Sequence, residues 1–239
     1  MRPLTFYGMV VWLVQNEWMN ESPSISVPAD VFPHDRVVFF SDAVFAIAIT
    51  LLAIELKPPA EELVAQFGAG GAWAHQIPLF VAFVISFMVT ALFWAGHMQA
   101  WKMVGRVTPG LLWLNIGQLM FVALMPFATA LYSESFMSDH VGPLVGYCLV
   151  LTGIPLFSFL TRRAMVRSQG VAQKLGPIGT RWFLVRTLVP LIVFAACIPL
   201  AFILPSWMGG MLFFLIFPIT PLARRWALRG HADQAGDAA

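Results

Sequence analysis

An acidic side chain, Asp42, lies about six residues inside an apolar run that covers residues 37–56. A carboxylate inside a membrane-spanning helix is costly. By default it marks a functional site, such as a proton relay or an ion path, or a paired structural charge. Because an α-helix rises about 1.5 Å per residue, Asp42 lies roughly 9 Å beyond Arg36. Asp42 and its neighbour Ser41 are therefore candidates for ion or proton chemistry near one end of a membrane helix.

Two later apolar runs, 76–96 and 110–132, place polar side chains at a similar depth. If successive runs cross a membrane in opposite directions, the end of the second run and the start of the third meet the start of the first. Five polar side chains then share one layer: Ser41, Asp42, Trp94, His97 and Asn115. Hydrogen bonds among them would satisfy the buried carboxylate and hydroxyl, as a low-dielectric interior requires. A structural clasp that joins three helices and a role in ion handling both fit this pattern.

The first run also carries an apolar stripe on one helix face. At about 100° per residue, Leu51 lies about 40° from Ile47, and Ile54 lies about −20° from it. Thr50 falls beside this stripe at about −60°, whereas Asp42 falls at about −140°. An isoleucine and leucine stripe at this spacing ordinarily faces a core or lipid. Only partner chains around it would make it the wall of a pore.

Composition decides the class of protein. The chain has 239 residues, of which 59% are hydrophobic and 11% charged, and its mean hydropathy is +0.78. A soluble domain usually has about 25% charged residues, and one of this size could not hide so much apolar surface from water. These values exclude a soluble enzyme, a nucleic-acid-binding domain and a disordered chain. Cys148 and Cys197 lie in apolar runs without metal-binding spacing, which indicates buried small side chains and predicts neither a metal nor a cofactor.

Six apolar runs are long enough to cross a bilayer, which needs about 20 residues for a helix. Their approximate bounds are 37–56, 76–96, 110–132, 141–160, 182–204 and 207–222. The predicted fold class is therefore an all-α integral membrane protein with six transmembrane helices. Four prolines inside these runs should kink their helices: Pro126, Pro155, Pro190 and Pro199.

Lys and Arg residues predict the orientation, because they accumulate in cytoplasmic loops. With the N-terminus inside, every Lys and Arg except Lys57 falls on the inner side. The loop 57–75 then lies outside, with Glu61 and Glu62, and both termini are cytoplasmic. The basic residues between the fourth and fifth runs, such as Arg162, belong to an inner loop in this interpretation.

The two ends of the chain differ from the apolar centre. Residues 1–33 contain an apolar stretch too short to span a membrane, which leaves a signal peptide, an interfacial helix or an extension upstream of a start at Met19 as alternatives. An extension or a poorly ordered tail is favoured. Residues 226–239 are predicted to be a disordered cytoplasmic tail. The six-helix membrane domain is expected to cover residues 34–225.

Several motifs resemble those of the transmembrane protein 175 family, the endolysosomal potassium channel and its prokaryotic relatives. The four positions of its R-x-x-x-F-S-D signature are matched by Arg36, Phe40, Ser41 and Asp42. Trp94-x-x-His97 resembles the family's W-x-x-H-H element, although Met98 replaces the second histidine. Residues 112–115 and 125–131 are similar to its third span. The resemblance covers roughly residues 34 to 225.

The resemblance implies an architecture and a set of pore residues. Prokaryotic members have a single six-span repeat and assemble as tetramers, so a homotetramer is expected. In the family the first span lines a central pore without a T-V-G-Y-G filter. Matched residue by residue, Ile47, Leu51 and Ile54 would form the hydrophobic constriction, with the Thr50 hydroxyl beside Ile47. Potassium ions, the lipid bilayer and further copies of the chain are the implied partners, in the inner membrane of a prokaryote.

Three functions compete at this stage. The favoured one is a potassium-preferring cation channel with passive flux, with proton permeability left open. The alternative is a proton-coupled secondary transporter in which Asp42 and His97 titrate during turnover, although no inverted repeat is visible in the sequence. An intramembrane enzyme lacks support, because the sequence holds no H-E-x-x-H, no G-x-S-x-G and no suitable pair of membrane aspartates. A purely structural membrane protein is the remaining interpretation.

Overall fold

A computed structural model describes residues 32–135, 140–203 and 216–228. Its helices are α2 (His34–Leu51), the 3-10 helix η1 (Leu52–Glu55), α3 (Glu61–His75), α4 (Ile77–Trp101), α5 (Pro109–Ala123), α6 (Met125–Ser135), α7 (Gly142–Ser168), α8 (Val171–Leu200) and α10 (Ile216–Leu228). Within these residues the only β-type pairing is one isolated bridge, between Phe32 and Val107. The predicted all-α class is confirmed. The predicted extension up to residue 31 lies outside the described residues.

Five helical segments are long and apolar enough to cross a membrane: His34–Glu55, Glu61–Trp101, Pro109–Ser133, Gly142–Ser168 and Val171–Leu200. Each overlaps one of the first five predicted runs. The sixth predicted run, 207–222, shares only residues 216–222 with α10, and its first part lies outside the described residues. Helix α10 continues through 226–228, the first residues of the predicted tail, and residues 229–239 are not described.

The loop predicted at 57–75 is wrong, because α3 occupies most of it. Glu61 and Glu62 lie in the first turn of α3, where negative charge interacts favourably with the helix dipole. Three glycines in the same segment lower its intrinsic helix propensity, and for this reason the sequence did not predict α3. One of them, Gly68, has φ 71° and ψ 169° and breaks the helical path.

The third predicted run is two helices. Helix α5 ends at Ala123, and α6 begins at Met125, directly before Pro126. Proline cannot donate the helical hydrogen bond and disfavours helical geometry in the residue before it, which accounts for a break at this point. Helix α8 departs from helical geometry at Gly176, with φ 67° and ψ 177°, rather than at Pro190 or Pro199.

The inner loop predicted between the fourth and fifth runs is mostly helical. Helix α7 continues to Ser168, beyond the predicted end at 160, and α8 begins at Val171, before the predicted start at 182. Gly170 lies between the two helices in the left-handed region, with φ 63°, which is the usual way to end a helix and reverse the chain. The basic residues of this segment therefore lie on helices, close to the bundle.

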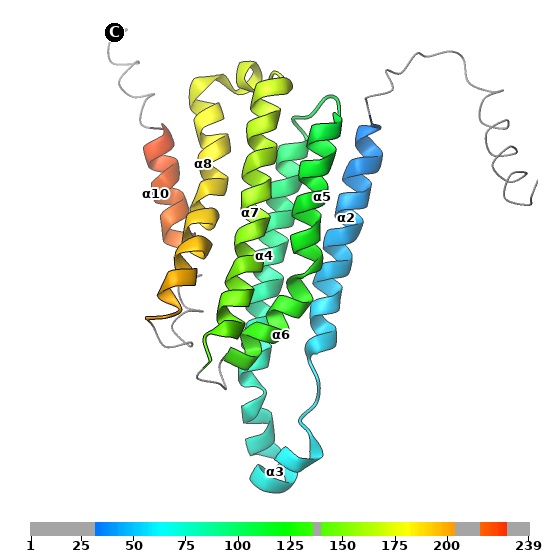
Figure 1. The fold of residues 1–239 in the computed structure, drawn as a ribbon, viewed down its shortest axis with the longest axis vertical. Helices are drawn as coiled ribbons and strands as arrows, with labels where there is room; N and C mark the ends of the chain where they lie inside the picture. Colours follow the sequence, from blue (N-terminus) through cyan, green and yellow to red (C-terminus); the bar gives the residue numbers. More distant parts are fainter. Residues whose placement is uncertain (1–31, 136–139, 204–215, 229–239) are drawn as a thin grey trace, which may run out of the picture. The chain divides into compact units, whose positions relative to one another are not determined.

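Helix α7 packs against α8, α5 and α6, while α2 packs against α5 and α4, and α10 against α8 (Figure 1). Small residues allow α5 and α7 to approach closely. A Cβ atom added at Gly117 of α5 would lie 2.2 Å from the Phe157 ring, and one added at Gly153 of α7 would lie 2.3 Å from the Phe121 ring. The two rings lie side by side, with centroids 5.7 Å apart. Each phenylalanine therefore fills the space left by a glycine of the other helix.

Two groups of buried side chains form the core. The larger group includes Phe45, Tyr147 and Leu151. Tyr147 stacks on Tyr132 with ring centroids 4.5 Å apart, and its hydroxyl hydrogen-bonds to Ser86 over 2.9 Å. The smaller group gathers around Trp101, where α2, α4, α5 and α7 meet. A layer of polar side chains lies between these apolar groups along α2 and α5.

Candidate functional site

A buried hydrogen-bonded chain connects α2, α5 and α4. The Asn115 Nδ2 donates to Ser41 Oγ over 2.9 Å, and Ser41 Oγ donates to the Val37 carbonyl oxygen over 2.8 Å. The Asn115 Oδ1 lies 2.8 Å from His97 Nε2. Because an amide oxygen only accepts, Nε2 carries the proton in this arrangement. The structure brings Ser41, Asn115 and His97 together, and below we refer to these three residues as the clasp.

Helical spacing turns the clasp residues inward. Helix α2 buries positions four and three residues apart, including Ser41, Phe45 and Ala48. Helix α5 does the same through Leu111, Asn115 and Gln118. The polar side chains thus occupy the face that each helix packs against its neighbours, where an unpaired group would be costly.

The His97 imidazole lies in an apolar setting. It is 2% exposed and lies between two aromatic rings, with centroids 5.5 Å from Phe45 and 5.6 Å from Trp101. Its Nδ1 is buried without a hydrogen-bond partner, and so is Nε2 of Gln118. The clasp therefore holds His97 through Nε2 alone.

Asp42 belongs to a different contact. Trp94 Nε1 donates to Asp42 Oδ1 over 2.9 Å, at the more exposed edge between α2 and α4. The five residues expected to form one network fall into two hydrogen-bonded groups, because no hydrogen bond in the described structure joins Asp42 to the clasp. Adjacent residues on a helix point about 100° apart, so Ser41 and Asp42 reach different neighbours.

The other two signature residues stand apart from these contacts. Arg36 and Phe40 are exposed, and Phe40 keeps 56% of its surface accessible in the subunit. Within the described part of the chain, the one salt bridge joins His34 and Asp35. The hydrogen bonds of this region therefore involve Ser41 and Asp42 but neither Arg36 nor Phe40.

The apolar stripe lies on a different face of α2 from the clasp, with Ile47 about 120° around the helix from Ser41. Ile47 and Ile54 are 58% and 66% exposed, and Leu51 and Thr50 are exposed as well. The Thr50 hydroxyl donates to the Ile47 carbonyl oxygen over 2.9 Å. Ile54 falls in η1, where the turn is tighter, at about 120° per residue. Three residues of this geometry place Ile54 directly above Leu51, which keeps the stripe continuous.

Two arginines contact α4 from neighbouring helices. The sequence assigned Arg162 to an inner loop and placed Arg186 near the inner end of the fifth run, and the structure places both on helices. Arg162 of α7 is 2% exposed, and its Nη2 donates to the Gly96 carbonyl oxygen over 2.7 Å. Its guanidinium also lies over the Phe183 ring, 4.5 Å from the centroid. Arg186 of α8 donates to Gln99 Oε1. The positive-inside rule could not reveal these contacts, because it counts basic residues in loops and does not describe basic residues that pack between helices.

Comparison with known proteins identifies the family. A family described as "Endosomal/lysosomal potassium channel TMEM175" matches residues 36–126. A relative from Chamaesiphon minutus, described as a potassium channel, is 33% identical over 141 residues, which cover 58% of this chain and 70% of that protein. This chain belongs to the TMEM175 family. The resemblance seen in the sequence motifs is therefore confirmed.

Two further TMEM175 comparisons extend this result. A Streptomyces collinus protein, described as a potassium channel, is 41% identical over 127 residues. That alignment covers 51% of this chain and 59% of the Streptomyces protein. The crystal structure of a lysosomal potassium-selective channel TMEM175 homolog from Chamaesiphon minutus matches with a TM-score of 0.69 at 24% identity, over 80% of this chain and 97% of that one. The two proteins share one fold.

Proposed function

We propose that this chain is the subunit of a potassium-preferring cation channel in a prokaryotic cell membrane, through which ions flow passively. Membership of the TMEM175 family supports the proposal, as do the Streptomyces and Chamaesiphon relatives, both of which are described as potassium channels. The same membership lends no support to the proton-coupled transporter or to the intramembrane enzyme. Residues 34–225 would form the channel domain.

The contrast between the two faces of α2 carries the proposal. One face is buried and hydrogen-bonded to α5, while the other exposes the apolar stripe of Ile47, Leu51 and Ile54. Because the stripe lies on the outside of the subunit, it can border an ion path only if further copies of the chain surround it. We propose a homotetramer in which four stripes meet at a central axis and form a hydrophobic constriction that gates by dewetting.

The clasp has a defined task in this proposal. Rotating α2 by one residue, about 100°, would replace Ile47 at the axis with a neighbouring side chain. Such a rotation would also break the hydrogen bond between Asn115 and Ser41, which spans 2.9 Å between two fully buried side chains. The clasp therefore orients the stripe toward the axis and takes no part in ion contact itself.

Substitution of Ile47 by Asn tests the pore. In four copies facing an axis, this change replaces an apolar ring with a polar one, which lowers the dewetting barrier. We expect a higher cation flux into liposomes and weaker discrimination between potassium and sodium. If Ile47 faced lipid instead, the buried amide would destabilise the protein and the flux would stay equal or fall.

Ile49 provides the matched control. It is the same residue type two positions away, about 200° around the helix, and it is half-buried. Ile49→Asn should give no gain in flux. An equal gain at both positions, or a loss at both, would contradict the assignment of Ile47, Leu51 and Ile54 to the pore.

The same liposomes distinguish a channel from a carrier. With an outward potassium gradient, a channel should give a flux that does not saturate with potassium concentration and does not depend on a counter-ion inside. A carrier would saturate and show counterflow. Repeating the measurement with and without a protonophore reports proton permeation, because trapped charge limits the potassium flux when protons cannot cross.

A further inference from the structure

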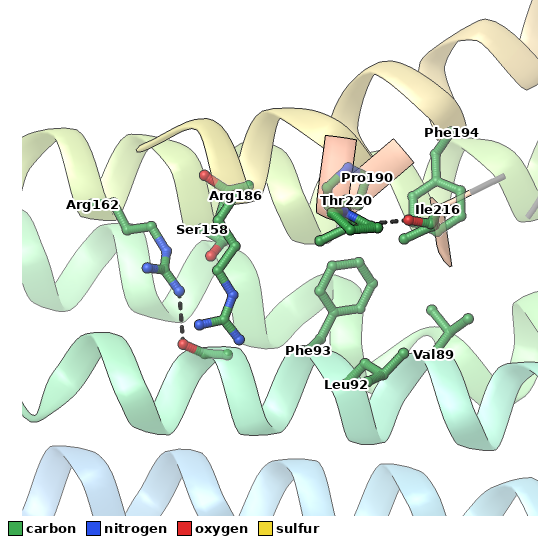
Figure 2. A pocket seen from close by; sticks show the side chains of 13 residues that line it. Val89, Leu92, Phe93, Ser158, Arg162, Arg186, Pro190, Phe194, Ile216 and Thr220 are labelled. Carbon is green, nitrogen blue, oxygen red and sulfur yellow. Dashed lines mark hydrogen bonds between the residues drawn. The ribbon is translucent and has the colours of Figure 1, made fainter. Parts of the chain in front are cut away.

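A cavity of about 320 Å³ lies between α4, α7, α8 and α10, and no residue of the clasp or of the stripe lines it. Figure 2 shows its two ends, with Arg162 and Arg186 at one and Val89 and Phe93 toward the other. Most of its wall is apolar, and Phe194 adds a second aromatic ring at the end opposite the arginines. One end is therefore cationic and the other is hydrocarbon-like.

The cationic end lacks a negative partner. Arg162 contacts the carbonyl oxygens of Gly96 and Phe183, at 2.7 and 3.4 Å, while its buried Nε has no hydrogen-bond partner. The charges of Arg162 and Arg186 repel each other. No carboxylate within the described ranges forms a salt bridge with either residue. An anion at this point would neutralise both arginines and provide acceptors for their remaining donors.

The cavity is long enough to hold part of one acyl chain and runs in the matching direction, since one leaflet of the hydrocarbon core is about 15 Å thick. Along α4, seven residues separate Gly96 from Val89, which is about 10 Å of helix, and along α8 the step from Arg186 to Phe194 is about 12 Å. In the predicted orientation, the arginines lie toward the cytoplasmic side and the cavity extends from them toward the middle of the membrane. A lipid of the cytoplasmic leaflet has its charge and its hydrocarbon in the same order.

We propose that this cavity binds one anionic phospholipid of the cytoplasmic leaflet. Its phosphate would lie between Arg162 and Arg186, since guanidinium groups recognise phosphate oxygens through paired N–H donors. One acyl chain would lie along Val89, Phe93 and Phe194. Because Ile216 and Thr220 of α10 line the same cavity, the lipid would also join α10 to α4 and α7. This site is independent of the proposed pore.

Native mass spectrometry of the full-length protein in detergent tests the proposal. After delipidation, the protein is titrated with palmitoyl-oleoyl phosphatidylglycerol or with the zwitterionic phosphatidylcholine of the same chains. We expect one phosphatidylglycerol per subunit, bound about tenfold or more tightly than phosphatidylcholine. Arg186→Gln should weaken phosphatidylglycerol binding about tenfold. Arg186→Lys, which keeps the charge but loses the paired N–H donors, should weaken it less than Arg186→Gln does. Arg186 is chosen because it is half-buried, so its substitution leaves fewer buried groups without a hydrogen-bond partner than the substitution of Arg162 would.

Arg163 provides the charge-matched control, because it adjoins Arg162 on α7 but is exposed and does not line the cavity. Arg163→Gln should leave lipid binding unchanged. Equal binding of the two lipids, or equal weakening by the substitutions at 163 and 186, would overturn the proposal. Full displacement of phosphatidylglycerol by inorganic phosphate would also overturn it, because the ligand would then be a free anion and the apolar wall would contribute nothing.

Discussion

Replacing Asn115 with Leu removes the central residue of the clasp while keeping a side chain of similar size. The variant leaves His97 Nε2–H without its acceptor, in a site where the imidazole is 2% exposed. Ser41 loses the hydrogen bond that it accepts but still donates to the Val37 carbonyl oxygen. The cost therefore falls mainly on His97.

The size of this effect follows from those contacts. An orphaned buried donor costs about 1–3 kcal/mol, and the lost hydrogen bond to Ser41 adds about 0.5–1.5 kcal/mol. We expect Asn115→Leu to lower the free energy of unfolding by about 2–4 kcal/mol. For a chain of this length, that corresponds to a fall of about 4–16 °C in the apparent unfolding temperature. Intrinsic fluorescence of the purified protein during a thermal ramp measures it.

Two comparisons make this prediction specific. Gln118 lies on the same buried face of α5, but its Nε2 has no partner, so Gln118→Leu should cost less than about 1 kcal/mol. A double variant that combines Asn115→Leu with His97→Phe should regain stability, because it removes the orphaned N–H and places a ring between Phe45 and Trp101. If Asn115→Leu unfolds at the wild-type temperature, or if Gln118→Leu costs as much, the clasp does not stabilise the fold.

Three further predictions concern packing, surface contacts and assembly. Gly117→Ala should destabilise the protein by about 1–3 kcal/mol, because its Cβ would overlap the Phe157 ring, whereas Gly110→Ala, which meets nothing within 4 Å, should be neutral in the same thermal assay. Asp42→Asn should lower the unfolding temperature less than Asn115→Leu does, since an amide oxygen still accepts from Trp94 at this exposed edge; an equal or larger fall would place Asp42 in the clasp after all. Native mass measurement should give four chains, and a conducting monomer would refute the proposed pore.

Helical period grouped the stripe on one face of α2 correctly. Depth predicted the contact between Asp42 and Trp94, but the hydrogen bonds do not join Asp42 to the clasp. The spacing of Ile47, Leu51 and Ile54 placed them on one face, and the structure leaves that face exposed. Depth alone suggested that Asp42 joins the clasp, but residues at one depth meet only if their directions also converge. Direction depends on how the helices are rotated relative to one another, which a single sequence does not encode in any short pattern.

Hydropathy located the spans but not the full helices. It identified the apolar centres of α7 and α8, whereas their polar ends continue as helix to Gly170 from both sides. Apolar periodicity fades where a helix leaves the hydrocarbon, although the backbone can remain helical there. For this reason Arg162 was expected in a loop, and the cationic end of the cavity could be found only from the structure.

The reciprocal fit of Phe121 with Gly153 and of Phe157 with Gly117 constrains how such a subunit can move. Each ring packs against a glycine of the other helix, so a slide of α5 along α7 in either direction would drive the rings into bulkier neighbours. In a conformational change of the subunit, α5 and α7 should therefore move together as one rigid unit. Motion is then left to the helices around this pair, with α2 on one flank and α8 with α10 on the other (Figure 1).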